Sequence, residues 1–144
     1  MRPASVCVLL AALAVATALS GCGKHKAGGT DLVLAQGISY SPANPTAGES
    51  ISITFTIEDL SGTNVAFVNV PWTVTRDGVP NAFSGVFPLV VPNTALQQTF
   101  TDTPGVGNHV YTIIIDPNHT VAADDTGADN FQFVPVTILP APAG

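Results

Sequence analysis

The alternation of apolar and polar residues between positions 51 and 58 is the feature that most restricts the fold of this chain. Ile51, Ile53, Phe55 and Ile57 occupy every second position, and Ser, Thr and Glu residues fill the places between them. A period of two puts alternate side chains on opposite faces of a β-strand, so the segment predicts a strand with one face in a core and one in water. No later stretch of the chain has a helical period of useful length. We therefore expect an all-β domain.

Six further segments have strand-like composition, and each is bounded by Gly, Pro, Asn or Asp residues that favour turns. Asp77-Gly78 predicts a tight turn after the third segment. Pro71 removes a backbone donor from that segment, which predicts a bulge or an unpaired edge there. Seven strands with turns at regular spacing indicate an immunoglobulin-like β-sandwich. The expected strands are 31–40, 51–58, 68–76, 83–91, 95–101, 109–115 and 130–138.

The phase of each segment predicts which side chains meet in the core. Val68, Val70, Trp72 and Val74 share one face of the third strand, so we expect Trp72 to fill the core as a tryptophan does in immunoglobulin domains. The same argument predicts inward positions in the fifth and sixth strands for Leu96, Phe100, Tyr111, Ile113 and Ile115.

The last strand has a change of phase. Phe131 and Phe133 share one face, and the later apolar residues share the same face, so the strand slips by one residue, which predicts a bulge near Pro135. The inward residues beyond the expected bulge are Val134, Val136 and Ile138.

The N-terminus has the pattern of a cleavable secretory signal. A short positive start precedes an apolar run from Val6 to Leu19, which is too short for a comfortable membrane span. Leu19-Ser20-Gly21-Cys22 resembles the lipobox of bacterial lipoproteins. We therefore expect residues 1–21 to be a lipoprotein signal peptide and Cys22 to carry the lipid that anchors the mature protein to a membrane.

The expected domain organisation follows from this signal. Residues 22–30 have no apolar periodicity and predict a flexible tether. Residues 31–138 form the β domain, and 139–144 form a Pro/Ala tail. Gly23 stands where an Asp would mark retention in the inner membrane, so the expected location is the cell envelope, and the outer membrane if the organism is Gram-negative.

The mature chain is strongly acidic and has no disulfide. Three basic side chains, two of them in the tether, stand against ten carboxylates, which gives a formal charge of −7 after removal of the signal peptide. Such a surface repels nucleic acid, so we expect no nucleic-acid partner. Cys7 leaves with the signal and Cys22 takes the lipid, so packing and hydrogen bonds alone must hold the domain.

No grouping of residues matches a catalytic motif. The domain has no thiol, no Gly-x-Ser-x-Gly turn and no phosphate-binding loop, and His109 and His119 are interpreted as surface or loop residues. We expect no enzymatic activity, no catalytic residues and no cofactor. Trp72, Tyr111 and Phe131 would form a sugar-stacking platform only if exposed, and their inward phase predicts a core position instead.

The polar loop at 116–129 is the one place where a cation site is plausible. It brings together Asp116, Asp124, Asp125 and Asp129, and calcium is bound by six to eight oxygens of this kind. The spacing matches no EF-hand, and an acidic loop is the expected solvated tip of an acidic protein. The loop is therefore predicted to bind calcium weakly or not at all.

Several segments resemble a bacterial domain family. The start at Asp31-Leu32-Val33, the turn Tyr40-Ser41-Pro42-Ala43-Asn44-Pro45 and the following Ala47-Gly48-Glu49 are similar to the opening of CARDB domains, the cell-adhesion-related domain found in bacteria. Val74-Thr75-Arg76-Asp77-Gly78 resembles the end of the third strand of that family, and the stretch from Gly107 to Pro117 resembles the approach to its Asp-Pro loop. The resemblance covers nearly all of the expected domain.

The resemblance implies a seven-stranded sandwich that serves as an extracellular adhesion or spacer module. The chain departs from the family at residues 121–130, which lack the two glutamates of the usual Asn-Glu-rich run. We expect a lipid-anchored, non-enzymatic adhesion or scaffold module with an envelope or surface protein as its partner. Two alternatives stay open: a lipoprotein that binds carbohydrate or calcium, and an accessory subunit of a secretion or envelope machine.

Overall fold

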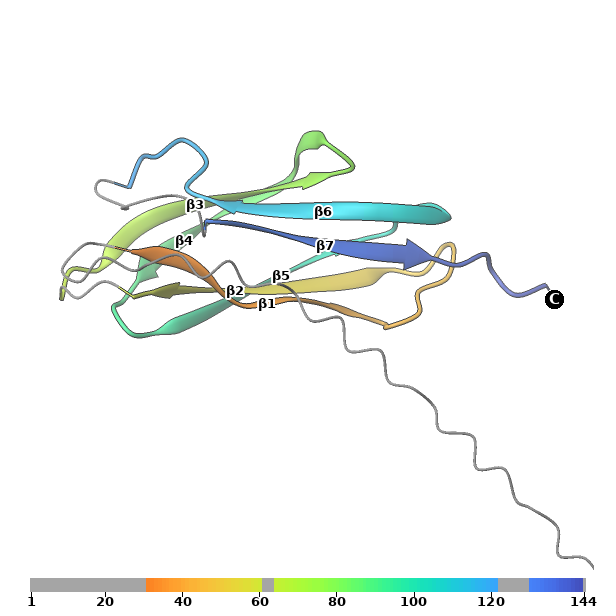
Figure 1. Cartoon of the computed structure of the whole chain (residues 1–144), viewed down its shortest axis with the longest axis horizontal. Helices are drawn as coiled ribbons and strands as arrows, with labels where there is room; N and C mark the ends of the chain where they lie inside the picture. The colour runs from red at the N-terminus through yellow and green to blue at the C-terminus, as the bar shows by residue number, and fades with distance from the viewer. Residues whose placement is uncertain (1–30, 61–63, 122–129, 144) are drawn as a thin grey trace, which may run out of the picture.

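Two antiparallel sheets pack face to face in the computed structural model, which describes residues 31–60, 64–121 and 130–143 (Figure 1). The sheets have the strand orders β1-β2-β5 and β4-β3-β6-β7, so the predicted all-β, seven-stranded sandwich is confirmed. The signal peptide, Cys22 and the tether lie outside the described residues. Nothing in the described part is a helix that could cross a membrane. The strands are β1 (Leu32–Ser41), β2 (Ile51–Asp59), β3 (Phe67–Arg76), β4 (Val79–Val90), β5 (Ala95–Asp102), β6 (Gly107–Ile115) and β7 (Phe131–Ile138).

The core lies between the two sheets, and Trp72 is at its centre. The indole ring is buried and meets Phe55 of the opposite sheet edge to face, with ring centroids 5.3 Å apart. Gly85 of β4 lies beneath this ring, because a Cβ at position 85 would come within 2.5 Å of Cζ2 of Trp72. The predicted inward positions of Phe100 and Tyr111 are confirmed, since both side chains are buried.

The hairpin between β3 and β4 has the tight turn that Asp77-Gly78 predicts. Both residues have positive φ angles, 53° and 79°, which matches the twist of two-residue hairpins. β4 starts directly after the turn at Val79, before the expected start at Phe83. The early part of β4 contains Asn81 in a left-handed conformation, and the β3–β4 register shifts between Val74 and Arg76. This irregular stretch has no clear strand pattern, which explains why the sequence did not predict it.

The predicted core position of Val68 is wrong, because 64% of this side chain is exposed. The change of phase comes from Asn69, which has a φ of 55° and lies opposite Pro88 of β4. Pairs on either side of these two residues keep the same register, so the distortion lies in both strands and neither strand has an extra residue. Val68 consequently turns outward, while Val70, Trp72 and Val74 stay inside.

Pro71 causes no bulge, since it pairs with Val86 of β4 in the regular register. The alternative prediction, an unpaired edge, is met only in part, because the ladder on the other side of β3 ends beside Pro71 while the proline carbonyl oxygen is still hydrogen-bonded. The ladder between β3 and β6 ends at the pair Trp72 and Ile115, so it stops at the residue next to Pro71. The carbonyl oxygen of Pro71 accepts a hydrogen bond from the backbone N–H of Asp116 at 2.8 Å, so its ring nitrogen also faces the place where the ladder has ended.

The phase change and the bulge predicted for the last strand are also wrong. β7 pairs with β6 in one uninterrupted register from Phe131 to Ile138, and Pro135 lies within it without a shift. Strict alternation therefore continues through the strand. It places Phe131 and Phe133 on the outer face of the sheet, with 52% and 67% of their side chains exposed.

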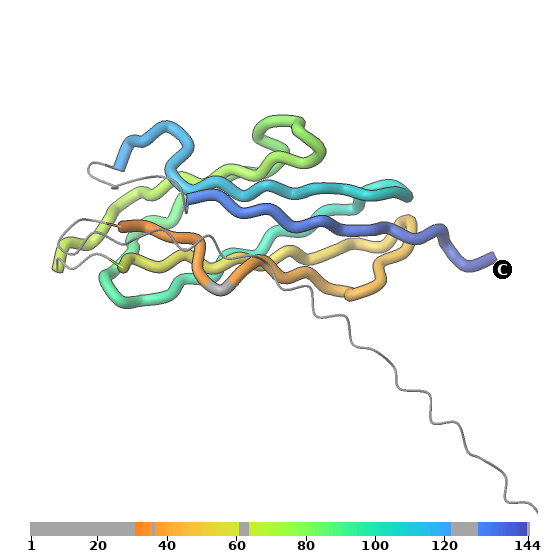
Figure 2. Tube along the Cα trace, viewed as in Figure 1, coloured from red at the N-terminus to blue at the C-terminus, as the bar shows by residue number. Residues whose placement is uncertain are grey.

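The end of the chain is tied to the connection between β1 and β2. Leu139 forms a parallel bridge with Thr46, and its carbonyl oxygen accepts a hydrogen bond from Ala47 at 2.8 Å. Figure 2 shows the C-terminal segment beside this connection. The pairing holds the end of β7 against the other sheet.

Candidate functional site

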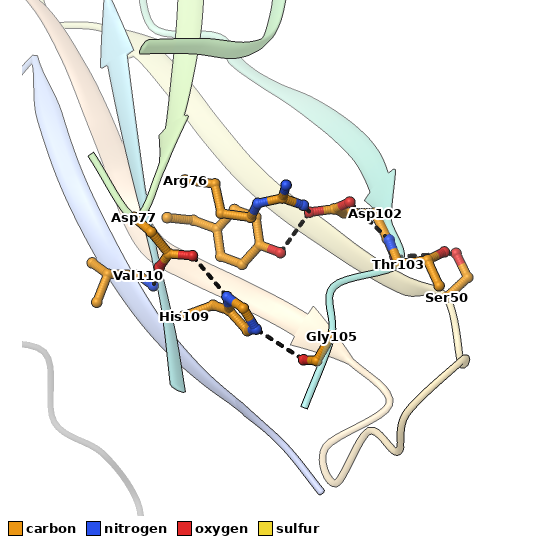
Figure 3. A network of polar contacts seen from close by, with 9 residues as sticks. Ser50, Arg76, Asp77, Asp102, Thr103, Gly105, His109 and Val110 are labelled. Carbon is orange, nitrogen blue, oxygen red and sulfur yellow. Dashed lines mark hydrogen bonds and ion pairs between the residues drawn. The ribbon is translucent and has the colours of Figure 1, made fainter. Parts of the chain in front are cut away.

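Three ionisable side chains from both sheets meet at one end of the sandwich, near the turns that lead out of β3 and β5 (Figure 3). Asp102 at the end of β5 accepts hydrogen bonds at its Oδ2 atom from Arg76 at 2.6 Å and from the Tyr111 hydroxyl at 2.7 Å. Its Oδ1 atom accepts the backbone N–H of Thr103 at 2.8 Å. The group therefore joins one sheet to the other, since Arg76 and Tyr111 belong to β3 and β6.

The protonation of this cluster favours a structural role. Burial raises the pKa of Asp102, but the hydrogen bonds from Tyr111 and Arg76 outweigh that effect and hold it below the ordinary value of 3.8. Burial and the neighbouring carboxylate raise the pKa of Tyr111 far above its usual range. At neutral pH the pair is thus a carboxylate and a neutral phenol, and the phenol proton is already shared with Asp102. Tyr111 is therefore not a phenolate nucleophile at neutral pH, and both oxygens of Asp102 accept hydrogen bonds from within the protein.

A second cluster beside the first contains His109 of β6. Its Nδ1 atom lies 2.7 Å from Oδ2 of Asp77 in the β3–β4 turn, and its Nε2 atom lies 2.9 Å from the carbonyl oxygen of Gly105 (Figure 3). The other carboxylate oxygen of Asp77 accepts the backbone N–H of Val110 at 2.8 Å. His109 thus contacts the turn before β4 and the turn before β6 at the same time.

The contacts of His109 define its protonation state. A carbonyl oxygen and an ionised carboxylate only accept hydrogen bonds, so both contacts form together only when both ring nitrogens carry protons. The hydrogen bond to Asp77 raises the pKa of His109 above its ordinary value of 6.5, although burial opposes the shift. A doubly protonated ring has no lone pair, so His109 in this arrangement is not a general base.

The carboxylate of Asp116, at the start of the acidic loop, accepts hydrogen bonds from later residues of the same loop. Oδ1 of Asp116 accepts hydrogen bonds from the N–H and the hydroxyl of Thr120 at 2.8 and 2.7 Å, and Oδ2 accepts the N–H of Val121 at 2.8 Å. Asp124, Asp125 and Asp129 lie outside the described residues. In residues 31–60, 64–121 and 130–143, no group of three or more His, Cys, Asp or Glu side chains is placed to hold a metal.

The aromatic residues considered for a sugar platform separate into two places. Trp72 and Tyr111 are buried in the core, as their phase predicted. Phe131 is exposed, contrary to the prediction, and shares the outer face of β7 with Phe133. The described residues therefore contain no platform formed by these three rings.

The outer face of the four-stranded sheet is rich in exposed apolar side chains. Its outward side chains include large, exposed apolar residues from all four strands, while its remaining outward positions carry Thr, Ser, Asn, Pro, Ala or Ile. None of the outward residues of these strands is charged. We call this surface the apolar face, and its exposed members are Val68, Val86, Leu89, Val110, Phe131 and Phe133.

The charges are instead located at the ends of the sandwich. Among the described residues, Glu58 points outward from the three-stranded sheet, one residue before the end of β2. The other charged residues lie at strand ends or in turns: Asp31, Glu49, Asp59, Arg76, Asp77, Asp102 and Asp116. The signal that could have located the apolar face from sequence is the absence of Lys, Arg, Asp and Glu from the last strand.

Comparisons with solved structures identify the fold. The crystal structure of the CARDB domain of the PF1109 protein from Pyrococcus furiosus, in complex with di-metal ions, aligns with a TM-score of 0.67 at 14% identity and covers 81% of this chain and 100% of that one. A solution structure of the same domain gives a TM-score of 0.62 at 15% identity, covering 78% and 97%.

A domain assigned to a cell surface protein of Methanosarcina acetivorans is also similar, with a TM-score of 0.60 and 19% identity over 76% of this chain and 92% of that one. No family model and no curated protein sequence matches this chain. The shared architecture over most of the chain therefore rests on structure, and it confirms the resemblance drawn from the turn motifs: this protein has the fold of a CARDB domain.

Proposed function

We propose that this chain is a lipid-anchored, non-enzymatic module of the cell envelope that binds another protein through the apolar face. The observation that carries the proposal is the exposure of Phe131 and Phe133 on a sheet surface without charges. Monomeric soluble proteins rarely expose contiguous apolar patches of more than a few hundred Å², and larger patches mark sites of interaction.

The energetics support an interface centred on these two rings. Full burial of a Phe side chain contributes about 1.5–3 kcal/mol, and a few large anchors of this kind supply most of the binding energy in protein interfaces. The Thr and Ser residues between the apolar side chains would add hydrogen bonds. A charged partner surface would lose water at this face without gaining an opposite charge, so the expected partner surface is also largely uncharged.

The edge of the sheet is a poorer binding site than its face. Ile115 of β6 donates a backbone hydrogen bond to Asn130, which lies directly opposite it. Hydrogen-bonded and non-hydrogen-bonded pairs alternate along an antiparallel ladder, so Val110 and Pro135, five positions further along, form a pair without backbone hydrogen bonds. The nitrogen of Pro135 therefore points to the free edge of β7, where it offers no donor to an added strand. This arrangement favours a partner that packs on the apolar face over one that extends the sheet.

Lipidation of Cys22 is the proposed means of anchoring. The lipobox match supports it, and the likeness to a domain of a cell surface protein fits a location in the envelope. The outer membrane is proposed if the organism is Gram-negative, because Gly23 replaces the inner-membrane signal. The absence of catalytic chemistry is supported by the two polar clusters, whose His109 and Tyr111 protons are already engaged.

The alternative functions have less support from the described residues. The di-metal ions belong to the PF1109 structure. In this chain both oxygens of the Asp116 carboxylate accept hydrogen bonds from Thr120 and Val121. A carbohydrate site would need an exposed aromatic platform, and only the Phe residues of β7 are exposed. An accessory subunit of an envelope machine would use the same apolar face, so the identity of the captured partner distinguishes it from an adhesion module.

The proposal is tested by photo-crosslinking from the apolar face in the native envelope. A photoreactive phenylalanine analogue replaces Phe133 in one strain and Thr101 in another, because Thr101 is exposed on the outer side of the opposite sheet. We expect one discrete crosslinked protein from position 133 that is absent from position 101, and we expect Phe131→Asp to reduce it at least tenfold. Equal crosslinking from both positions, or none from position 133, would refute the proposed binding face.

A further inference from the structure

We infer that His109 is a proton-dependent clip that holds the turn before β6 against the turn before β4 and releases it as the pH rises. The clip depends on geometry, since the ring bridges Asp77 and Gly105, which are separated by the length of β4 and β5 in sequence. The contact with Asp77 needs a proton on Nδ1, and the contact with Gly105 needs a proton on Nε2. The ring therefore keeps both contacts only as an imidazolium. This property is independent of the proposed binding face.

Loss of one proton forces the ring to give up one of its two contacts. A neutral imidazole has one N–H donor, and it faces two acceptors. The deprotonated ring can keep one contact, to Asp77 or to Gly105. Because a hydrogen bond to a carboxylate is stronger than one to a neutral carbonyl, we expect the ring to stay with Asp77 and to release Gly105.

The two turns are expected to respond differently. The β3–β4 turn has bonds to β6 that do not involve the ring: Asp77 donates its backbone N–H to the carbonyl oxygen of Val110 at 2.9 Å, and its carboxylate accepts the N–H of Val110. This turn therefore stays in place. The hydrogen bond that reaches Gly105 comes from the side chain of His109, so deprotonation should loosen the segment around Gly105 more than the β3–β4 turn, while buried Pro104 keeps its packing.

The charged groups around His109 determine the direction of the shift. Asp77 faces the ring from the β3–β4 turn and favours its charged form, whereas Arg76 at the end of β3 disfavours it. Arg76 is paired with Asp102 of β5, which also holds the Tyr111 hydroxyl on β6. β4 and β7 contain no ionisable residue. The balance raises the pKa of His109, so its contribution to stability is complete below pH 6.5 and is lost as the pH rises through the higher folded value.

The test compares the purified full-length chain in detergent with its His109→Gln variant. We expect the difference in melting temperature between the two proteins to shrink by at least about 2 °C between about pH 6 and pH 9. Because they differ only at position 109, this difference isolates the ring. Thr137→Val, which removes a hydrogen bond to Asn108 at the same end of the sandwich, should leave the pH profile parallel to wild type.

Nuclear magnetic resonance gives a second, local measurement. The ring of His109 should titrate above 6.5 in the wild type and at a lower pH in Asp77→Asn. This variant removes the negative charge beside the ring and keeps the size of the side chain. The amide resonances near Gly105 should broaden or shift with this titration, while those of Asp77 and Gly78 should move less. Titration of His109 at or below 6.5, or parallel pH profiles for wild type and His109→Gln, would overturn the inference.

Discussion

Replacing Gly85 by Ala tests how the central tryptophan is accommodated. A Cβ at position 85 would lie 2.5 Å from Cζ2, 2.6 Å from Cε2 and 2.8 Å from Nε1 of Trp72. Carbon atoms in contact are ordinarily about 3.5–4.0 Å apart. The indole ring is rigid and contacts Phe55 and Phe100 in the core, so it has little room to move away. We therefore expect Gly85→Ala to destabilise the domain by about 1–3 kcal/mol, the usual cost of overpacking.

A double-mutant cycle separates this clash from other effects of the substitution. The closest of the three atoms, Cζ2, belongs to the outer ring that a phenylalanine lacks, whereas a phenyl ring still fills the space near Cε2 and Nε1, so Trp72→Phe should relieve the clash in part. In the described part of the chain, Nε1 has no hydrogen-bond partner, and its loss should leave no acceptor unsatisfied. Trp72→Phe alone should cost less than the about 3–5 kcal/mol expected for Trp72→Ala. The double variant should then be more stable than the sum of the single changes predicts, by part of the about 1–3 kcal/mol that the clash costs.

Urea denaturation followed by far-ultraviolet circular dichroism measures all four proteins in the same way. With a slope of about 1–3 kcal/mol per molar urea, the expected coupling shifts the midpoint by up to roughly 1 M. Gly85→Ser is a useful companion because it introduces a Cβ at the same position and should behave like Ala. Additive effects of Gly85→Ala and Trp72→Phe would refute the argument that the glycine is needed for the indole.

Three further predictions concern the acid limit, the anchor and the loop. The pKa of Asp102 is depressed in the folded protein, so the stabilisation by this carboxylate is complete above pH 3.8 and is lost as the pH falls through the lower folded value. Asp102→Asn should therefore lower the melting temperature at neutral pH and make the melting temperature decline less steeply in acid. Cys22→Ala should abolish lipidation and move the protein out of the membrane fraction after a high-salt wash. Calcium in millimolar excess over chelator should change the melting temperature little, whereas a rise of several degrees that is lost in Asp125→Asn or Asp129→Asn would favour a metal site.

Elements with regular patterning were predictable from the sequence. The alternation at 51–58 yields β2, whose inward residues Ile51, Ile53, Phe55 and Ile57 are all buried. The Asp77-Gly78 turn follows directly from the backbone freedom that a two-residue hairpin requires. Period and turn chemistry are local properties, so they appear in a single sequence without knowledge of the partner strands.

The failures occurred where two strands share one distortion. Asn69 adopts a left-handed conformation opposite Pro88, so β3 and β4 change phase together and Val68 turns outward. The sequence shows each of these residues, but it does not show that they are neighbours across the ladder. The same limit applies to the clusters around Asp102 and His109, because their members come from distant segments that only the sandwich brings together.

The error in β7 has a different origin, and it bears on function. The prediction assumed that two Phe residues must lie inside, and it introduced a bulge at Pro135 to place them there. The ladder between β6 and β7 is instead regular, so Val134, Val136 and Ile138 fill the core and no packing requirement places Phe131 or Phe133. Their exposure costs solubility, and the core between the sheets does not require it. A partner that covers them is the simplest physical reason for their presence, which is why Phe133 is the position from which to search for that partner.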